Sequence, residues 1–183
     1  GGSTLVVSNE GAAVEVSQVF MNTNLAAAGG VVATILLSLV LTGKIDVTMV
    51  INGAIAGLVA ITAEPADPSG GMAIVIGALG GILVYFSILY FDKKLNLDDP
   101  VGAISAHGIV GILGVLVVPL TDSDASLLWQ FYGVVAIAGF TFVASLITIL
   151  VINKFLPIRA SDEEQELGLD VTEIGIEAYP EFK

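Results

Sequence analysis

His107 is the one ionisable side chain in a long apolar stretch of this sequence. No lysine, arginine, aspartate or glutamate lies between Asp99 and Asp122, and residues 100–120 match the ~20 residues that cross a bilayer. An imidazole at membrane depth is costly unless it faces a helix-bundle interior or a pore, and such groups usually mark ion or proton pathways. Histidine can donate, accept and pass a proton near neutral pH. The alternative interpretation is a packing histidine whose ring nitrogens bond a neighbouring backbone.

The composition of the whole chain is typical of a membrane protein. Mean hydropathy is +0.93, and charged residues make up 13% against the roughly 25% of a soluble domain. The absence of cysteine excludes disulfides and thiolate metal sites, and neither a cofactor nor a metal is predicted. The chain has no basic patch for nucleic acid. With one histidine and no paired carboxylates on a buried face, a hydrolytic enzyme is disfavoured.

Five apolar segments between the charged residues predict five transmembrane helices and an all-α integral membrane fold. They cover approximately 19–41, 47–63, 71–91, 100–120 and 127–152, and the second is the shortest. Asp98 and Asp99 stand directly before the fourth segment, where carboxylates cap a helix and favour its dipole. We therefore expect Asp99 to cap the helix that carries His107, with Pro100 in its first turn.

The basic residues predict the orientation in the membrane. If five helices alternate, all six lie on the same side: Lys44, Lys93, Lys94, Lys154, Arg159 and Lys183. The positive-inside rule then places the start of the chain outside the plasma or inner membrane and its end in the cytoplasm. The predicted domains are an extracellular helix end and loop at 1–18, the five helices within 19–153, and a cytoplasmic regulatory tail at 154–183.

Small residues recur at helical spacing in three of the predicted helices. GxxxG motifs at residues 53–57 and 77–81 predict close approach of helix backbones. Around the histidine, small residues at similar spacing predict one face that is bare except for the imidazole. The members of this face are Ala103, His107, Gly111 and Gly114.

Four stretches, in this order, resemble the C-terminal half of an ammonium transporter of the Amt/Mep/Rh family. They are VFMNTNLAAAGG, INGAIAGLVAITA, DDPVGAISAHGIVGILG and ELGLDVTEIGIEAYP, and the last favours the Amt branch. The resemblance implies eleven transmembrane helices per subunit, in two inverted five-helix repeats plus a final helix, assembled as a homotrimer with one pore in each subunit. This chain would hold the end of the sixth helix and helices seven to eleven. Its start at Gly1, in mid-motif, indicates that the N-terminal half of the subunit is missing.

The resemblance also implies roles for individual residues. His107 matches the second histidine of the twin-histidine pair that lines the family's hydrophobic pore. Ser3 matches the serine that hydrogen-bonds ammonium at the outer recruitment site, although a polar residue at a helix end is an ordinary alternative. Asn52 occupies a position that is often polar near the pore. The alternative is a polar side chain that only helps the helices to pack.

The acidic tail combines a helix signal with apolar residues. Ser161-Asp-Glu-Glu164 fits a capping box that starts a short helix, and the alternative is a solvated acidic terminus. The family resemblance implies packing of the tail against a neighbouring subunit and coupling to a PII-type signalling protein. Ile174 and Ile176 replace polar residues that are common in the family, so subunit coupling here is expected to differ.

The function predicted from these residues is transport of ammonium or ammonia through a hydrophobic pore in the lipid bilayer. Deprotonation of ammonium would give selectivity over potassium, and both electrogenic and neutral transport are left open. An ammonium sensor, which binds without net flux and signals through the tail, is the alternative. A third interpretation is a structural membrane fragment without activity.

Overall fold

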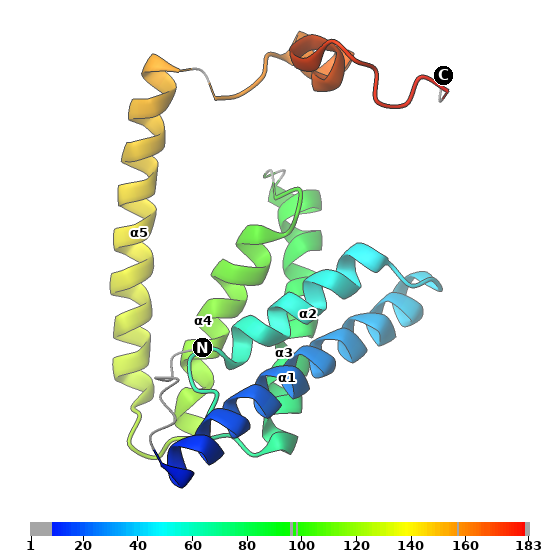
Figure 1. Cartoon of the computed structure of the whole chain (residues 1–183). Coiled ribbons are helices and arrows are strands. Elements are labelled where there is room, and N and C mark those ends of the chain that lie inside the picture. The colour runs from blue at the N-terminus through cyan, green and yellow to red at the C-terminus, as the bar shows by residue number, and fades with distance from the viewer. Residues whose placement is uncertain (1–8, 96, 98, 157, 182–183) are drawn as a thin grey trace. The chain divides into compact units, whose positions relative to one another are not determined.

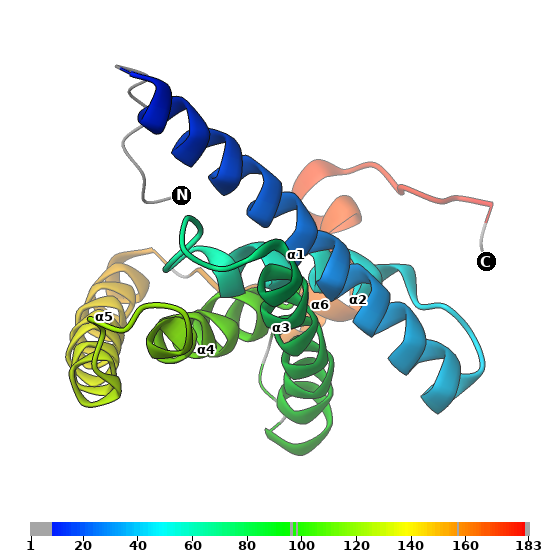
Figure 2. The same cartoon turned by 90° about the horizontal axis from the view of Figure 1, so that it is seen from below.

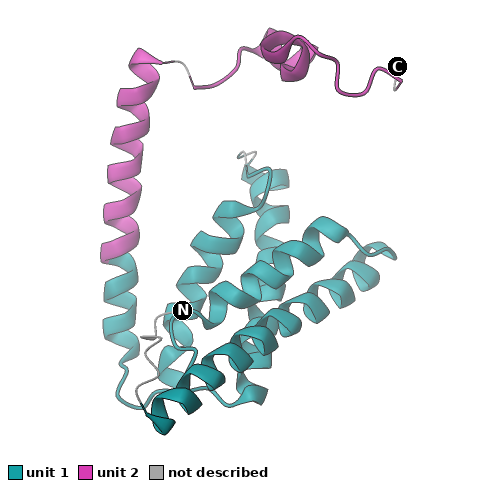
Figure 3. Ribbon diagram, viewed as in Figure 1, with its two compact units in different colours: residues 1–135 teal, residues 136–183 magenta. Residues whose placement is uncertain are grey.

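The described part of the chain is entirely helical in its regular structure. The computed structural model describes residues 9–95, 97, 99–156 and 158–181, so Ser3 lies outside the described residues. The α-helices are α1 (Glu10–Thr42), α2 (Val47–Ile61), α3 (Gly70–Tyr90), α4 (Val110–Val117), α5 (Leu127–Phe155) and α6 (Asp162–Leu167) (Figure 1). Three segments are π-helical, η1 (Phe91–Leu95), η2 (Ile104–Ile109) and η4 (Asp170–Ile174), and η3 (Val118–Leu120) is a 3-10 turn. Two compact units, residues 1–135 and 136–183, divide the chain within α5 (Figure 3).

Length and composition identify the helices that can cross a membrane. Three described stretches are long and apolar enough: Glu10–Thr42, Gly70–Leu95 and Leu127–Phe155. The helices Val47–Ile61 and Ile104–Leu120 are apolar but shorter. The all-α membrane fold class is therefore confirmed, whereas the crossing of a membrane by the two shorter helices stays a prediction.

The first helix begins earlier than its hydropathy predicts. α1 starts at Glu10 rather than Val19, so the predicted N-terminal loop is wrong for residues 10–18. The side chain of Asn9 caps this helix, because its Oδ1 accepts a hydrogen bond from the N–H of Ala12 at 2.9 Å. Polar residues in the first turns lower the hydropathy of the stretch without removing its capacity to form a helix.

Helices α1, α2 and α3 form the core of the first unit by direct contact between their backbones. They lie side by side, and Figure 2 shows α1 crossing the other two. A Cβ added at Gly30 would meet the carbonyl oxygen of Gly53, and one added at Gly57 or Gly77 would meet that of Ala26. The contacted atoms are backbone, so the helices would have to separate to admit a side chain. The close approach predicted from the GxxxG motifs is confirmed.

Two fully buried polar side chains of α1 differ in how they are satisfied. The Nδ2 of Asn22 donates to the carbonyl oxygens of Pro65 at 3.0 Å and Pro68 at 2.7 Å, which ties the α2–α3 connector to α1. Within the described part of the chain, Asn22 Oδ1 and Ser38 Oγ have no hydrogen-bond partner. A buried oxygen without a partner costs free energy, so Ser38 contributes no polar stabilisation to this core.

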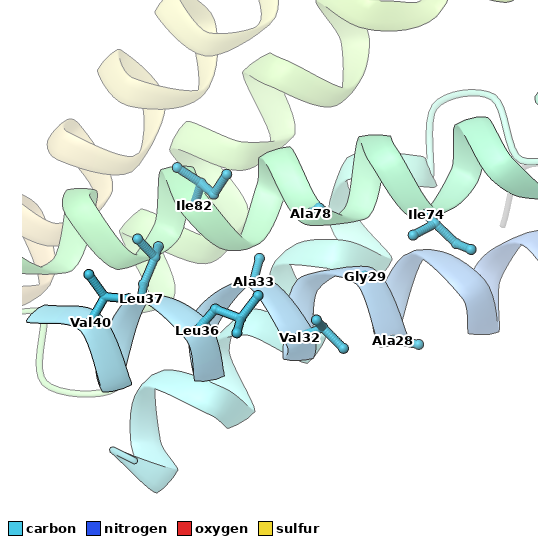
Figure 4. Close-up of a pocket in the computed structure, with 10 residues that line it drawn as sticks. All are labelled: Ala28, Gly29, Val32, Ala33, Leu36, Leu37, Val40, Ile74, Ala78 and Ile82. Atoms are coloured by element: carbon cyan, nitrogen blue, oxygen red, sulfur yellow. The ribbon is translucent and has the colours of Figure 1, made fainter. Parts of the chain in front are cut away.

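An apolar groove of about 570 Å³ runs between α1 and α3 (Figure 4). From α3 it is lined by Ile74, Ala78 and Ile82, and from α1 by Ala28, Gly29, Val32, Ala33, Leu36, Leu37 and Val40. These side chains carry no charge or hydrogen-bonding group, so the groove has no chemistry that could recognise a cation.

Candidate functional site

His107 lies in η2, the π-helical segment that leads into α4. The helix predicted to begin at Pro100 starts only after Gly102, whose φ of 72° lies in the left-handed region. The N–H of Gly102 donates to the carbonyl oxygen of Asp99 at 2.9 Å and closes a turn around Pro100. The predicted helix start is therefore wrong, because a residue with positive φ cannot belong to a right-handed helix.

Asp99 holds the beginning of η2 through its carboxylate. Its Oδ1 accepts the N–H of Ile104 at 2.9 Å, and its Oδ2 accepts the N–H of Ser105 at 3.1 Å and the Oγ–H of Ser105 at 3.0 Å. The N–H groups of Ile104 and Ser105 are amides that a helix leaves without partners at its first turn. Burial raises the pKa of Asp99, but the hydrogen bonds from Ile104 and Ser105 outweigh it and hold the pKa below the usual 3.8. Asp98, the other predicted cap, lies outside the described residues.

The imidazole of His107 is exposed on the wide turn of η2, whereas its neighbours are buried. Ser105, Ala106 and Val110 are each at most 1% exposed and anchor the segment in the core of the unit. Among the described residues, no group forms a hydrogen bond with the ring nitrogens of His107. The ring therefore satisfies no neighbouring backbone group of this part of the chain.

The single bare face predicted around His107 does not persist along the segment. Ala103 and His107 are exposed, but Gly114 is buried, and a Cβ added there would stand 2.8 Å from the carbonyl oxygen of Ala60 on α2. The prediction that Gly114 shares a face with His107 is therefore wrong. A π-helical turn bonds residues five apart, so a spacing of four no longer returns to the same face.

Asn52 of α2 contacts the turn that precedes η2. A Cβ added at Gly102 would stand 2.8 Å from Asn52 Oδ1 and 3.0 Å from Ile88 Cδ1, so α2, α3 and the histidine segment meet at this glycine. The Nδ2 of Asn52 donates to the carbonyl oxygen of Thr48 at 3.1 Å. Gly102 was not predicted as part of the site, although a glycine two residues after Pro100 is a turn signal.

Among the described residues, three carboxylates lie close enough together to act as ligands of one metal ion. Oxygens of Glu64, Asp67 and Asp122 lie within 4.8 Å of one another. Burial first, and then the charges of Asp67 and Asp122, raise the pKa of Glu64 above its usual 4.5. Hard cations prefer such oxygen ligands. Exposed acidic groups are common without an ion, so we assign no metal here.

The tail of the second unit is folded by its own hydrogen bonds. Ser161 Oγ accepts the N–H of Glu164 at 3.3 Å, and Glu164 Oε2 accepts the N–H of Ser161 at 2.8 Å. The predicted capping box and the short helix that it starts, α6, are thus confirmed. Farther on, Asp170 Oδ2 accepts the N–H of Ala178 at 2.7 Å, and this bond is the main cause of the lowered pKa of Asp170.

Comparison with known proteins identifies the family. A model of the Ammonium Transporter Family matches residues 1–179. The chain belongs to the ammonium transporter family. It is 37% identical over 175 residues to an ammonium transporter of Bacillus subtilis, covering 87% of this chain and 43% of that protein. It is 36% identical over 189 residues to ammonium transporter Amt2 of Archaeoglobus fulgidus, covering 92% of this chain and 40% of the relative.

Solved structures of this family share the fold. A structure described as a sensor Amt protein matches with a TM-score of 0.80 and 30% identity, over 87% of this chain and 42% of that chain. Candida albicans Mep2 matches with a TM-score of 0.73 and 27% identity, over 82% of this chain and 38% of Mep2. The chain thus spans less than half the length of these family members, and the resemblance found in its motifs is confirmed.

Proposed function

We propose that the complete subunit containing this chain moves ammonium or ammonia across the membrane through an apolar pore lined by His107. Family membership carries this proposal, because relatives that match most of the chain are described as ammonium transporters. The chain covers 43% of the Bacillus subtilis relative. We therefore propose that an N-terminal half completes the subunit and supplies the first histidine of the twin-histidine pair.

The proposed selectivity follows from solvation. A bare cation in a dry pore meets an idealised desolvation cost on the order of tens of kcal/mol, and this cost is similar for ammonium and potassium. Ammonium can lose a proton and cross as neutral ammonia, whereas potassium cannot shed its charge. An apolar constriction behind an outer recruitment site would therefore let ammonia through and exclude potassium.

The setting of His107 supports its place in this pathway. Its imidazole is exposed, and no described group bonds its ring nitrogens. A neutral imidazole has one donor and one acceptor nitrogen, so it can exchange hydrogen bonds with ammonia without adding a fixed charge. π-Helical turns occur frequently at functional sites.

The remaining assignments rest on the family. We propose that Ser3 binds ammonium at the outer recruitment site and that Asn52 lies near the pore. The subunit would form a homotrimer in the plasma or inner membrane, with the start of this chain outside and the tail in the cytoplasm. A PII-type signalling protein is the proposed partner of the folded tail.

The test is a current on a solid-supported membrane that carries the complete subunit after an ammonium concentration jump. Wild type is expected to give a sustained current, and His107→Ala is expected to abolish it or to admit potassium. Asn24→Ala is the matched control, because Asn24 is exposed on α1 and its Nδ2 donates to the carbonyl oxygen of Phe20 within its own helix. An unchanged current and potassium exclusion in His107→Ala would remove the histidine from the pathway.

An ammonium sensor is the second candidate, favoured by the likeness to the sensor Amt structure at a TM-score of 0.80. A sensor would bind ammonium without sustained current, so equilibrium binding to the same proteoliposomes separates the two functions. The isolated chain is expected to show no ammonium flux in liposomes. Flux from the chain alone would contradict the proposal that the pore needs a second half.

A further inference from the structure

We propose that Asn52 is a positioning residue for His107 and acts through the backbone of Gly102. This inference rests on the proposed role of His107 in transport. It assigns Asn52 a task different from contact with the substrate: the amide of α2 sets where the histidine segment begins.

The contact between Asn52 and Gly102 is close and supported from behind. Gly102 is buried, and a Cβ added there would stand 2.8 Å from Asn52 Oδ1 and 3.1 Å from Asn52 Cγ. The amide is held to its own helix, because its Nδ2 donates to the carbonyl oxygen of Thr48 at 3.1 Å. The next residue, Gly53, lies in the tightest part of the α1–α2 interface, where its carbonyl oxygen leaves no room for a Cβ on Gly30. Asn52 therefore fills the space beside Gly102 from a helix that is itself fixed against α1.

A short chain of bonds leads from Gly102 to His107. The carbonyl oxygen of Gly102 accepts the N–H of Ala106 at 2.7 Å. Ala106 is 1% exposed and directly precedes His107. A displacement of Gly102 therefore displaces the backbone next to the imidazole, and the buried Ala106 transmits it because its surroundings are packed.

Glycine is required at position 102 for two reasons. Its φ of 72° is strained for residues with a Cβ, and the space that a Cβ would fill is already occupied by Asn52 Oδ1 and Ile88 Cδ1. An alanine at this position would push the Asn52 amide away and strain its bond to Thr48. The two positions are thus coupled by size, whereas a substrate ligand at Asn52 would act independently of residue 102.

A double-mutant cycle in the complete subunit tests the coupling. The variants are Asn52→Ala, Gly102→Ala and the double variant, with ammonium current and the ammonium-to-potassium current ratio as readouts. Each single substitution is expected to lower the current about 5-fold or more, and the double variant is expected to stay within about 2-fold of Gly102→Ala, as for residues in contact. If the fold-losses of current in the two single variants multiply in the double variant, Asn52 acts independently of Gly102 and the proposal is overturned.

Matched controls separate positioning from a general loss of folding. Gly71→Ala adds a Cβ on α3 where nothing lies within 4 Å, and Asn24→Ala removes an amide with the same bond within its own helix. Both controls are expected to keep the wild-type current. Wild type with neither a current nor ammonium uptake into liposomes would instead refute the proposed transport function, and the coupling would then be read from spectroscopy alone.

The NMR signal of the His107 imidazole ring supplies that independent readout. In subunits with isotope-labelled histidine, the signal is assigned by its loss in His107→Ala. It is expected to shift in Asn52→Ala and to shift less in Asn52→Ser, which keeps a short polar side chain. An unshifted signal in Asn52→Ala would overturn the proposal, even if Gly102→Ala did not fold.

Discussion

Two regions of the first unit are held together by opposite means. In the core formed by α1, α2 and α3, backbone meets backbone at Gly57 and Gly77. The start of the His107 segment is held by a side chain instead, because the carboxylate of Asp99 accepts three hydrogen bonds from Ile104 and Ser105. The difference separates a frame set mainly by the close fit of its helices from a site whose start depends on polar bonds. The two regions should therefore respond differently to added volume and to pH.

Added volume in the core should have the largest effect. Gly77→Val would drive a branched side chain into the carbonyl oxygen of Ala26. Overpacking typically costs about 1–3 kcal/mol, and a rigid backbone neighbour places this substitution at the upper end or beyond. Thermal unfolding in detergent, with the yield of folded protein, measures the loss. Gly71→Val on the same helix is the control, and an equal loss in both variants would show that β-branching rather than contact is responsible.

Removal of the carboxylate of Asp99 should have a smaller and more local effect. Asp99→Ala deletes the acceptor of three hydrogen bonds to Ile104 and Ser105. Bonds to a charged group contribute about 1.5–3 kcal/mol, part of which solvent restores at this half-buried position. Amide hydrogen exchange should quicken at residues 104 and 105 while the α1–α3 core keeps its protection. Faster exchange throughout the core would mean that the two regions are not separate.

Acid should distinguish the two regions in the same way. The pKa of Asp99 is lower in the fold than the usual 3.8, so its stabilisation is fully present above that value and is lost as the pH falls through the lowered pKa. Protection factors at residues 104 and 105 are expected to fall over this range, and those of α1 around Gly30 to stay level. In Asp99→Asn the pH dependence should disappear.

The smallest effect is expected at Ser38. Its Oγ is buried without a partner among the described residues, so Ser38→Ala removes a desolvation cost and should change stability by less than about 1 kcal/mol, in the stabilising direction. Ser105→Ala is the matched comparison, because Ser105 Oγ donates to Asp99 at 3.0 Å, and it should destabilise. If thermal unfolding ranks Ser38→Ala below Ser105→Ala, the Oγ of Ser38 stabilises the core after all.

Much of the frame could be predicted from the sequence because it depends on local patterns. Gaps between charges indicate the apolar helices, and the GxxxG motifs mark the positions at which backbones touch. The start of α1 could not be predicted in this way, since a cap at Asn9 outweighs the low hydropathy of the polar residues that follow. The capping box at Ser161 was predictable because its members lie three residues apart.

The candidate site was less predictable because its geometry depends on contacts between distant segments. Both Asp99 and His107 can be found in the sequence. Asp99 is a charged residue at the edge of an apolar segment, and His107 is a polar residue inside it. The wide turn of η2 is invisible to hydropathy, since the same apolar residues suit an α-helix and a π-helix. The contact of Asn52 with Gly102 joins residues fifty positions apart, and no local pattern specifies such a pair.

The folded tail has a consequence for the thermodynamics of recognition. Asp170 closes a loop back to Ala178, and the capping box orders the turn before it, so the tail holds its shape through bonds of its own. A disordered segment that folds on binding spends about 2–5 kcal/mol of its interaction energy on ordering. For a partner of this tail, most of that entropy loss has already occurred before the two meet. The proposed binding of a signalling protein can then be tight with a small contact area, and Asp170→Ala should weaken it by removing the bond that closes the loop.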